Sequence, residues 1–342
     1  MRSALFPDKK ELIFTELERP TVEEGYAIIE VCFAGICGSD VNVWQGMHGT
    51  ATYPRIPGHE FVGVLREFIG NPNEDLESGD IVVVQPYYSC GKCEQCTSGK
   101  SNICKDLAIL GIHMDGGFAE FVKVPLDKVV KMPKDVDLQV AALTEPLSVA
   151  VHDVRRSNLK VGQSVAVIGG GPIGALIAIV ARLAGASNVT ICEVNENRVN
   201  FLRKLGFDAA NPVQEDPETI LKAHNGGSGF DVVFEVSGSK GGVQSMTALA
   251  KPGGTIMAIG MSATQNPFDG ATVFFKELQI IGARLHSQSA FRDAAKIVAS
   301  GKINQELKQL IDRVFPLSEV VEAMNYQIND KEHFKVLIDI SK

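Results

Sequence analysis

The sequence has no apolar run long enough to cross a membrane. Its longest one, residues 173–181, ends at Arg182 and falls far short of the ~20 residues that a membrane-spanning helix needs. The opening segment carries charges at Arg2 and Asp8, so it lacks the apolar core of a signal peptide. These absences predict a cytoplasmic protein without a membrane partner.

Positive charge is also scarce. The 342 residues contain 33 Lys and Arg against 41 Asp and Glu, a formal net charge of −8 at pH 7. Nucleic-acid binders gather Lys and Arg on one face, so this balance argues against a nucleic-acid partner and favours a small-molecule substrate. The length favours two domains, and a hydrophobic share of 45% is ordinary for a globular protein.

Cysteine is rare and odd in number, which argues against a disulfide framework. Two of the seven cysteines, Cys32 and Cys192, lie in apolar runs and are expected to be small buried side chains. Four others form a Cys-x2-Cys-x2-Cys-x7-Cys run, namely Cys90, Cys93, Cys96 and Cys104. Four thiolates in one short polar segment predict a closed zinc site, although spacing alone leaves an iron–sulfur cluster open.

The hydrophobic pattern changes its period along the chain. From Gly25 to about Lys131, β-like runs at 27–33, 61–68, 81–85 and 118–124 predict an all-β unit. After Gly162, strands and helices alternate, which predicts a parallel, doubly wound sheet. The expected strands there are 164–168, 189–194, 231–236, 254–260 and 278–285, and the expected helices are 173–183, 196–205, 217–224 and 243–250. Helices at 291–300 and 318–329 and a strand at 334–338 are expected to return to the first unit.

A glycine-rich turn lies between the strand 164–168 and the helix 173–183. Gly169, Gly171 and Gly174 form Gly-x-Gly-x-x-Gly there, and Glu193 follows at the end of the next strand. This context is typical of dinucleotide binding, and a carboxylate on the ribose favours NAD over NADP. Arg198 either contacts the cofactor or is an exposed helix charge.

Four further residues are scattered along the chain but have the chemistry of a second metal site. Cys37, His59, Glu60 and Glu145 offer a thiolate, an imidazole and two carboxylates. Each has a simpler explanation when taken alone, such as a salt bridge for Glu60. Together they suffice for a zinc ion with an exchangeable position, which would make a bound alcohol more acidic.

These features together resemble the zinc-dependent medium-chain dehydrogenases over essentially the whole chain. The similarity is carried by the segments 35–40, 58–60 and 144–148, by the four-cysteine segment and by the glycine turn. It implies a GroES-like β domain at 1–147 and 286–342, with a structural zinc lobe at 88–106. A Rossmann NAD-binding domain at 148–285 would be inserted in it, and the subunits would form a homo-dimer or homo-tetramer.

The resemblance also implies roles for the metal-site residues. Cys37 and His59 correspond to permanent ligands of a catalytic zinc, and Glu60 and Glu145 to carboxylates that complete or exchange in its coordination. Asp40 would orient the histidine, and Ser39 would begin a proton relay. Asn42 stands where relatives often have a relay histidine, so the proton would leave through the nicotinamide ribose or through His48. The implied cofactor-binding residues are Gly169, Gly171, Pro172, Ile173, Gly174, Glu193, Arg198 and Gly260.

A glutamate at position 145 instead of a cysteine resembles the polyol, sugar-acid, threonine and butanediol dehydrogenases. The segment 110–118 and Arg284 are most similar to hexonate and hexitol dehydrogenases, such as the L-galactonate and L-gulonate 5-dehydrogenases. The expected reaction is oxidation of a secondary alcohol to a ketone by hydride transfer to NAD, with two zinc ions per subunit. The expected substrate-binding residues are Trp44, His113, Phe118 and Arg284. Threonine or 2,3-butanediol oxidation and a regulatory NAD-binding zinc protein remain alternatives.

Overall fold

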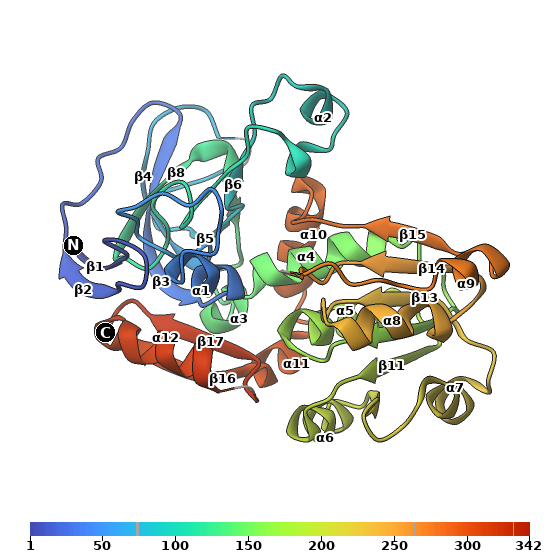
Figure 1. Ribbon diagram of the computed structural model, residues 1–342. Helices are drawn as coiled ribbons and strands as arrows, with labels where there is room; N and C mark the ends of the chain where they lie inside the picture. The colour runs from blue at the N-terminus through green and yellow to red at the C-terminus, as the bar shows by residue number, and fades with distance from the viewer. Residues whose placement is uncertain (73–74, 263, 331) are drawn as a thin grey trace. The chain divides into compact units, whose positions relative to one another are not determined.

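The computed structural model describes residues 1–72, 75–262, 264–330 and 332–342. The chain divides into two compact units (Figure 1). The first comprises residues 1–148 and 287–342, and the second comprises residues 149–286. Among the described residues, no helix combines the length and the apolar character that a membrane crossing requires.

The first unit is built on a mixed sheet of seven strands. Strand β3 (Tyr26–Gly35) lies at its centre and pairs antiparallel with β4 (Glu60–Phe68), with β8 (Phe121–Pro125) and with the last strand of the chain, β17 (Lys335–Asp339). The C-terminal segment therefore returns to this sheet, as the sequence predicts. The remaining strands are β5 (Ile81–Val84), β9 (Val129–Lys131) and β16 (Ile311–Pro316).

Shorter elements surround this sheet. Two small hairpins pair β1 (Arg2–Leu5) with β2 (Ile13–Glu16) and β6 (Tyr87–Tyr88) with β7 (Ala108–Ile109). The helices are α1 (Gly38–Trp44), α2 (Glu94–Thr97), α3 (Leu138–Ala141), α10 (Gln288–Ala299), α11 (Asn304–Gln309) and α12 (Val320–Asn329).

The second unit is a six-stranded parallel sheet in the order β12-β11-β10-β13-β14-β15. This is the Rossmann order, in which the chain reverses direction across the sheet between β10 and β13 and leaves a ligand crevice at their carboxyl ends. The doubly wound prediction is thereby confirmed. The strands are β10 (Ser164–Ile168), β11 (Asn188–Cys192), β12 (Asp208–Ala210), β13 (Phe230–Glu235), β14 (Ala250–Ala258) and β15 (Gln279–Gly282), and the helices are α5 (Pro172–Leu183), α6 (Glu196–Lys204), α7 (Pro217–Asn225), α8 (Lys240–Leu249) and α9 (Gly270–Phe275).

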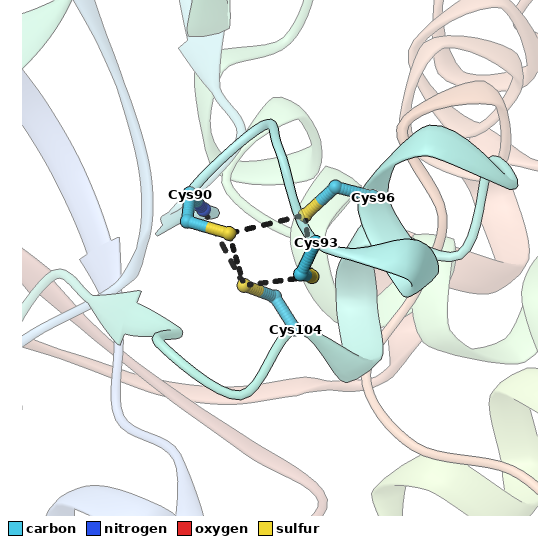
Figure 2. Close-up of side chains that lie close together, drawn as sticks. All are labelled: Cys90, Cys93, Cys96 and Cys104. Atoms are coloured by element: carbon cyan, nitrogen blue, oxygen red, sulfur yellow. Dashed lines mark hydrogen bonds between the residues drawn. The ribbon is translucent and has the colours of Figure 1, made fainter.

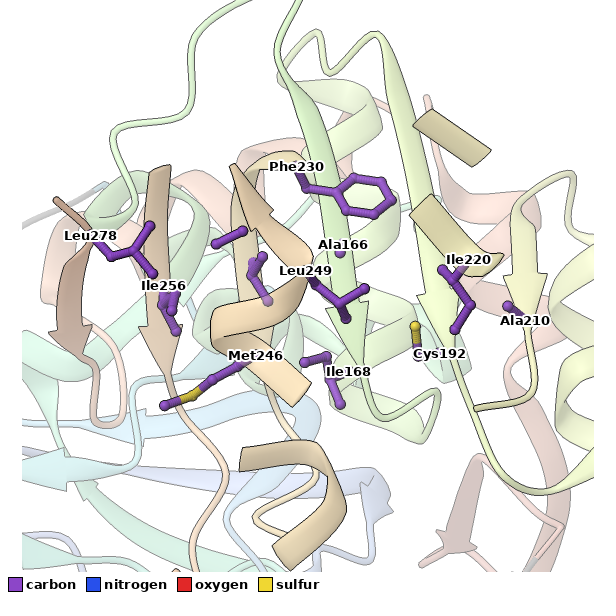
Figure 3. Close-up of a cluster of buried hydrophobic side chains, with 12 residues drawn as sticks. Ala166, Ile168, Cys192, Ala210, Ile220, Phe230, Met246, Leu249, Ile256 and Leu278 are labelled. Carbon is purple, nitrogen blue, oxygen red and sulfur yellow. The ribbon is translucent and has the colours of Figure 1, made fainter. Parts of the chain in front are cut away.

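Buried apolar side chains fill the space between this sheet and the helices α7 and α8 (Figure 3). Phe230 at the start of β13 is completely buried, and Ile220 of α7 and Leu249 of α8 pack in the same cluster. Burying a side chain of this size stabilises the fold by roughly 1.5–3 kcal/mol. The sheet is therefore a rigid base for the loops at its carboxyl edge.

One long helix has no counterpart in the sequence prediction. Helix α4 spans Thr144–Arg156 and carries Glu145 and Pro146 in its first turn, where proline is tolerated because no intrahelical N–H bond is lost. His152 and Asp153 are buried in it, at 8% and 1% exposure. Buried polar residues interrupt the apolar pattern by which a helix is recognised.

Candidate metal and nucleotide sites

The structure brings Cys37, His59 and Glu60 together. The antiparallel pairing of β3 with β4 sets Gly35 opposite Glu60, so the chain leaving β3 meets the chain entering β4. The ligand atoms of the three residues all lie within 4.8 Å of one another. One ion can therefore be reached by a thiolate, an imidazole and a carboxylate from two segments of the chain.

The carboxylate of Asp40 contacts the backbone on both sides of this cluster and the ring of His59. The backbone N–H of Cys37 donates to its Oδ2 at 2.9 Å and that of Gly58 to its Oδ1 at 3.3 Å. Nδ1 of His59 lies 3.5 Å from the same Oδ1. This directs Nδ1 of His59 toward the carboxylate and leaves Nε2, which is 3.2 Å from the Ser39 hydroxyl, for a metal.

The electrostatics of the cluster favour a positive charge. Burial lowers the pKa of His59, but Asp40 and Cys37 together outweigh burial and keep this pKa well above its ordinary value. Burial and Glu145 raise the pKa of Glu60, against the effect of Lys335. A buried set of acidic groups around one imidazole is suited to a divalent cation, so the residues present fit a zinc ion.

Glu145 is buried at 7% exposure in the first turn of α4, where the helix dipole favours a carboxylate. It does not join the close cluster of Cys37, His59 and Glu60. Its charge nevertheless acts on Glu60 and Lys335. The structure thus leaves Glu145 beside the cluster, as a further carboxylate and not as an equal fourth member.

Lys335 is the residue of this site that sequence reasoning misses. It opens β17, is only 6% exposed and forms an ion pair with Glu60. Its Nζ also donates to the backbone carbonyl of Ile36, the residue before Cys37, at 3.1 Å. A lysine before the apolar run Val336–Ile338 is the signal that the sequence offers, and it does not identify the partner.

The loop before His59 is fixed by close backbone packing. Gly58 has φ +95°, and a Cβ there would overlap the ring of Phe118. The backbone N–H of Gly117 donates to the carbonyl of Gly58 at 2.8 Å. The ring of Phe118 is completely buried in this packing, so it supports the loop that carries His59.

The four cysteines of the lobe form a compact tetrahedron of sulfur atoms (Figure 2). The sulfur–sulfur distances given by their contacts run from 3.4 to 3.9 Å. Four thiolates at a zinc–sulfur distance of about 2.3 Å are separated by about 3.8 Å. A four-iron cluster holds its thiolates on separate iron ions and so farther apart. The geometry favours one zinc ion over the iron–sulfur alternative.

The thiols of the lobe cannot all ionise without a cation. Backbone N–H groups of Lys92 and Cys93 lower the pKa of Cys90 to about 6. Desolvation and Cys93 raise the pKa of Cys96 to about 11. The backbone N–H of Cys96 lowers the pKa of Cys93 as well. Thiolates at Cys90 and Cys93 are therefore favoured and one at Cys96 is not, and a divalent metal would bring all the cysteines into the thiolate form.

The glycine turn of the second unit has the geometry of a nucleotide-binding loop. Gly169 follows β10 with φ +103°, and Gly171 is the N-cap of α5, whose first residue is Pro172. A Cβ on Gly174 would overlap the carbonyl oxygen of Gly169. The turn therefore requires glycine at both places and leaves the N-terminus of α5 open to an anion. Ile173 lies in the first turn of the same helix.

Glu193 follows β11 and lies at the glycine turn. Its Oε2 accepts the N–H of Gly170 and its Oε1 that of Asn195, both at 2.8 Å. Nη1 of Arg198 lies 4.0 Å from Oε2. Gly260 follows β14, donates its N–H to the Glu235 carbonyl at 2.9 Å, and packs against Gly238 too closely for any side chain.

One of the substrate candidates, His113, contacts a neighbouring threonine. His113 accepts the Ile109 N–H on Nδ1 at 3.1 Å, so its Nε2 carries the proton of the neutral ring and lies 2.9 Å from the Thr50 hydroxyl. His48 lies 3.5 Å from the same hydroxyl. The structure thus links His113 with the residue considered for the proton relay.

The two other substrate candidates belong to different elements of the structure. Trp44 is half-buried at the end of α1, and Arg284 is exposed beyond β15. The backbone N–H groups of Met47 and His48 donate to the carbonyl of Asn42 at 2.9 and 3.3 Å. The backbone thus connects Asn42 with the loop that carries His48.

Models of two known protein families match the two parts of the chain. Residues 23–134 match the alcohol dehydrogenase GroES-like domain, and residues 172–300 match the zinc-binding dehydrogenase family. The GroES-like and Rossmann architecture predicted from the sequence is confirmed.

Curated proteins similar to the chain include two bacterial sugar-acid enzymes. A 2-dehydro-3-deoxy-L-galactonate 5-dehydrogenase of Pseudoalteromonas atlantica is 38% identical over 93% of this chain and 95% of its own. An L-galactonate-5-dehydrogenase of Escherichia coli K12 is 32% identical over 96% of both chains. The chain belongs to the zinc-binding, medium-chain alcohol dehydrogenase family, and it is an oxidoreductase.

Solved structures agree over nearly the full length. A zinc-binding dehydrogenase of Sinorhizobium meliloti bound to NADP has a TM-score of 0.91 at 30% identity, covering 99% of this chain and 98% of its own. A protein described as a short-chain alcohol dehydrogenase of Escherichia coli CFT073, complexed with NADH, has the same TM-score and identity over 99% of both chains. The two neighbours thus differ in the form of their dinucleotide.

Proposed function

We propose that this protein oxidises a secondary alcohol of a polyol or sugar acid to the ketone, with NAD as the hydride acceptor. The observation that carries the proposal is the close cluster of half-buried Cys37 with buried His59 and Glu60, with Glu145 beside it. Two sugar-acid dehydrogenases among its relatives support this substrate class. The two compact units would be the catalytic and NAD-binding domains.

The chain's own residues have distinct tasks. Cys37 and His59 would hold the catalytic zinc, and Glu60 and Glu145 would complete its coordination in turn. When bound, the zinc ion would supply Lewis acidity to a substrate hydroxyl, and the dinucleotide would accept the hydride. Asp40 keeps Nε2 of His59 directed at the metal through its contact with Nδ1.

Ser39 would take up the proton of the substrate hydroxyl, because its Oγ stands 3.2 Å from Nε2 of His59. Asn42 cannot carry that proton onward. The proton would then leave through the cofactor ribose or through His48. The Thr50 hydroxyl contacts both His48 and His113. Unchanged turnover in His48→Ala would support the ribose route.

Glu193 supports NAD over NADP. It is held by two backbone N–H groups with oxygen lone pairs left for ribose hydroxyls, and it would repel a ribose phosphate. Arg198 lies close enough to Glu193 to be held by it and would face the adenosine half of the cofactor. Activity with NADP alone would contradict this assignment.

The polar substrate would be bound by Trp44, His113 and Arg284. The Nε2–H of His113 can donate a hydrogen bond to a substrate hydroxyl, because Nδ1 already accepts the Ile109 N–H. The guanidinium of Arg284 matches a carboxylate. Threonine and 2,3-butanediol remain alternatives, because Glu145 fits those branches equally well.

A homo-oligomer is proposed through the edge of the second unit's sheet. In the described part of the chain β15 is the last strand of that sheet. Phe274 and Phe275, on the preceding helix, are 76% and 80% exposed. Exposed aromatic side chains of this size are typical of an interaction surface. Sedimentation of Phe275→Glu beside the unmodified protein would test this.

The decisive experiment combines a metal count with a substrate panel. Two zinc ions per subunit support a dehydrogenase, whereas one ion supports a regulatory zinc protein that keeps NAD only as a ligand. Hexonates, hexitols, threonine and butanediol are each assayed with NAD and NADP by the absorbance of the reduced cofactor. The absence of turnover in the whole panel, with only one zinc bound, would contradict the proposal.

A further inference from the structure

We propose that Lys335 is a positioning residue that holds Glu60 in place and keeps one coordination position of the catalytic metal available to substrate. This inference rests on the proposed function in one respect, because it requires a divalent metal between Cys37, His59 and Glu60. It concerns a residue from the opposite end of the chain that none of the metal-site patterns contains.

The strand order explains how Lys335 reaches the site. Strand β17 pairs with β3, and β3 pairs with β4, so Lys335 and Glu60 lie on strands that flank β3. Two strand spacings are about 9.6 Å, a distance that a lysine and a glutamate side chain bridge together when no side chain stands between them. The residue of β3 opposite Glu60 is Gly35.

Gly35 provides the gap that the ion pair needs. A Cβ at this position would overlap Oε2 of Glu60 and would lie 3.0 Å from Cε of Lys335. The φ of Gly35 is not in the left-handed region, so the backbone conformation at the end of β3 does not require a glycine. Its missing side chain is instead what lets the ammonium cross β3 to the carboxylate.

The ammonium is fixed at a second point. Its Nζ donates to the Ile36 carbonyl at 3.1 Å, and the start of β17 is itself anchored because the Lys335 N–H donates to Asp312 at 2.9 Å. A buried lysine whose ammonium donates to the Ile36 carbonyl and whose backbone is anchored at Asp312 does not swing away when Glu60 moves. Lys335 is therefore a stationary charge beside a movable carboxylate.

The charges of the site indicate what Lys335 does there. The candidate metal ligands, a thiolate at Cys37 and carboxylates at Glu60 and Glu145, would bring three negative charges to the metal position. The buried carboxylate of Asp40 is a fourth, and it is paired with His59 and with two backbone N–H groups. A divalent metal supplies two positive charges, and Lys335 supplies the third. Without Lys335 the carboxylate of Glu60 would be a buried charge whose only cationic partner is the metal, and an unpaired buried charge is costly.

The consequence concerns the metal's coordination. Glu60 lies within reach of an ion shared with Cys37 and His59. While Lys335 shares this carboxylate, Glu60 binds the metal weakly and yields to an alcohol hydroxyl. When Lys335 is removed, Glu60 should bind the metal permanently and block the position that substrate uses.

The test compares Lys335→Met with Lys335→Arg in the cobalt-substituted full-length protein. Cobalt is exchanged into the Cys37, His59 and Glu60 site alone, with zinc kept in the four-cysteine lobe, so that the thiolate–cobalt absorption comes from Cys37 and the visible bands report the coordination number of this site. We expect Lys335→Met to change these bands, to lose metal to a chelator about tenfold more slowly and to lower kcat at least tenfold, with NAD affinity unchanged. Lys335→Arg should restore the bands and most of kcat, because it retains the charge.

The double variant Lys335→Met/Glu60→Gln isolates the coupling between the two residues. Its cobalt bands should match those of Glu60→Gln alone, because the carboxylate that Lys335 restrains is then absent. If Lys335→Met does not fold, Lys335→Gln, which keeps a polar side chain of nearly the same reach, replaces it in every measurement.

Two failures are distinguishable. If the unmodified protein gives no absorption from a metal bound to Cys37, the proposed metal site and function fail first. If it does, and the neutral Lys335 variants keep the same bands, the same metal loss and the same kcat, the metal site stands and the positioning role of Lys335 is overturned.

Discussion

The two candidate metal sites of the first unit differ in how the chain builds them. Cys90, Cys93, Cys96 and Cys104 come from one short, mostly polar segment, and three of the four cysteines are half-buried. Cys37, His59 and Glu60 come from the ends of two paired strands, with Asp40 and Lys335 behind them, and their surroundings are buried.

The difference shows what each site demands of the fold. The lobe needs a metal to be ordered, because it has no apolar core of its own. The buried cluster is ordered by strand pairing and by Asp40 before any metal arrives. At a local site, part of the free energy of metal binding is used to order the chain. At a site that the fold has already ordered, that free energy remains available for binding the metal and the substrate.

The largest expected effect comes from the buried cluster. Cys37→Ser or His59→Ala should lower kcat by at least about 10³-fold, because several kcal/mol of Lewis-acid stabilisation are lost. Dinucleotide binding, measured by quenching or calorimetry, should persist, since the glycine turn belongs to the other unit. Loss of folding would instead make this site structural, like the lobe.

Asp40→Ala should have the next largest effect. It removes the acceptor for the Cys37 and Gly58 N–H groups and the partner of His59. Loss of a residue that orients a metal ligand costs about 10–100-fold in metal affinity or activity. Asp40→Asn is the matched control, and zinc titration checks both variants. Unchanged zinc affinity in Asp40→Ala would contradict this role.

Cys93→Ser should affect the lobe alone. We expect one zinc ion fewer per subunit and faster proteolysis within residues 88–106, with kcat within about tenfold of the unmodified protein, because the buried cluster keeps its own ligands. Elemental analysis and limited proteolysis measure the two outcomes. A loss of both zinc ions would show that the sites are coupled.

The smallest effect concerns a carboxylate that neither metal site uses. Burial raises the pKa of Asp80, but its bond to Lys131 and the N–H of Glu77 lower it below the ordinary value. The stability from this pair is present above pH 4 and is lost as the pH falls through the lowered pKa. In Asp80→Asn, the free energy of unfolding should therefore fall by about 1 kcal/mol less between neutral and acid pH than in the unmodified protein.

Acid also releases metals, because their ligands become protonated. The Asp80→Asn comparison should be repeated with metal-depleted protein. An unchanged difference between the two proteins separates the carboxylate from metal loss, and a vanished difference would contradict the assignment to Asp80.

The predictions from sequence succeeded where spacing carries the chemistry. The glycine turn between β10 and α5 could be predicted because its glycines lie within six consecutive positions, and Gly174 in the first turn of α5 packs against the Gly169 carbonyl. Helix α4 was not, because Pro146 and the buried His152 and Asp153 interrupt its apolar pattern. The convergence of Cys37 with His59 depends on pairing between β3 and β4, which no local pattern encodes.

The sequence alone therefore determined the two-part architecture, and it predicts the ligand types, the zinc lobe and the dinucleotide turn, since each depends on neighbours along the chain. Tertiary structure alone decided that Asp40 faces Nδ1 of His59 and that Lys335 crosses Gly35 to Glu60. The reason is physical. Lys335 and the Ile36 carbonyl that it contacts are 299 positions apart, and only strand pairing converts such a separation into a buried contact.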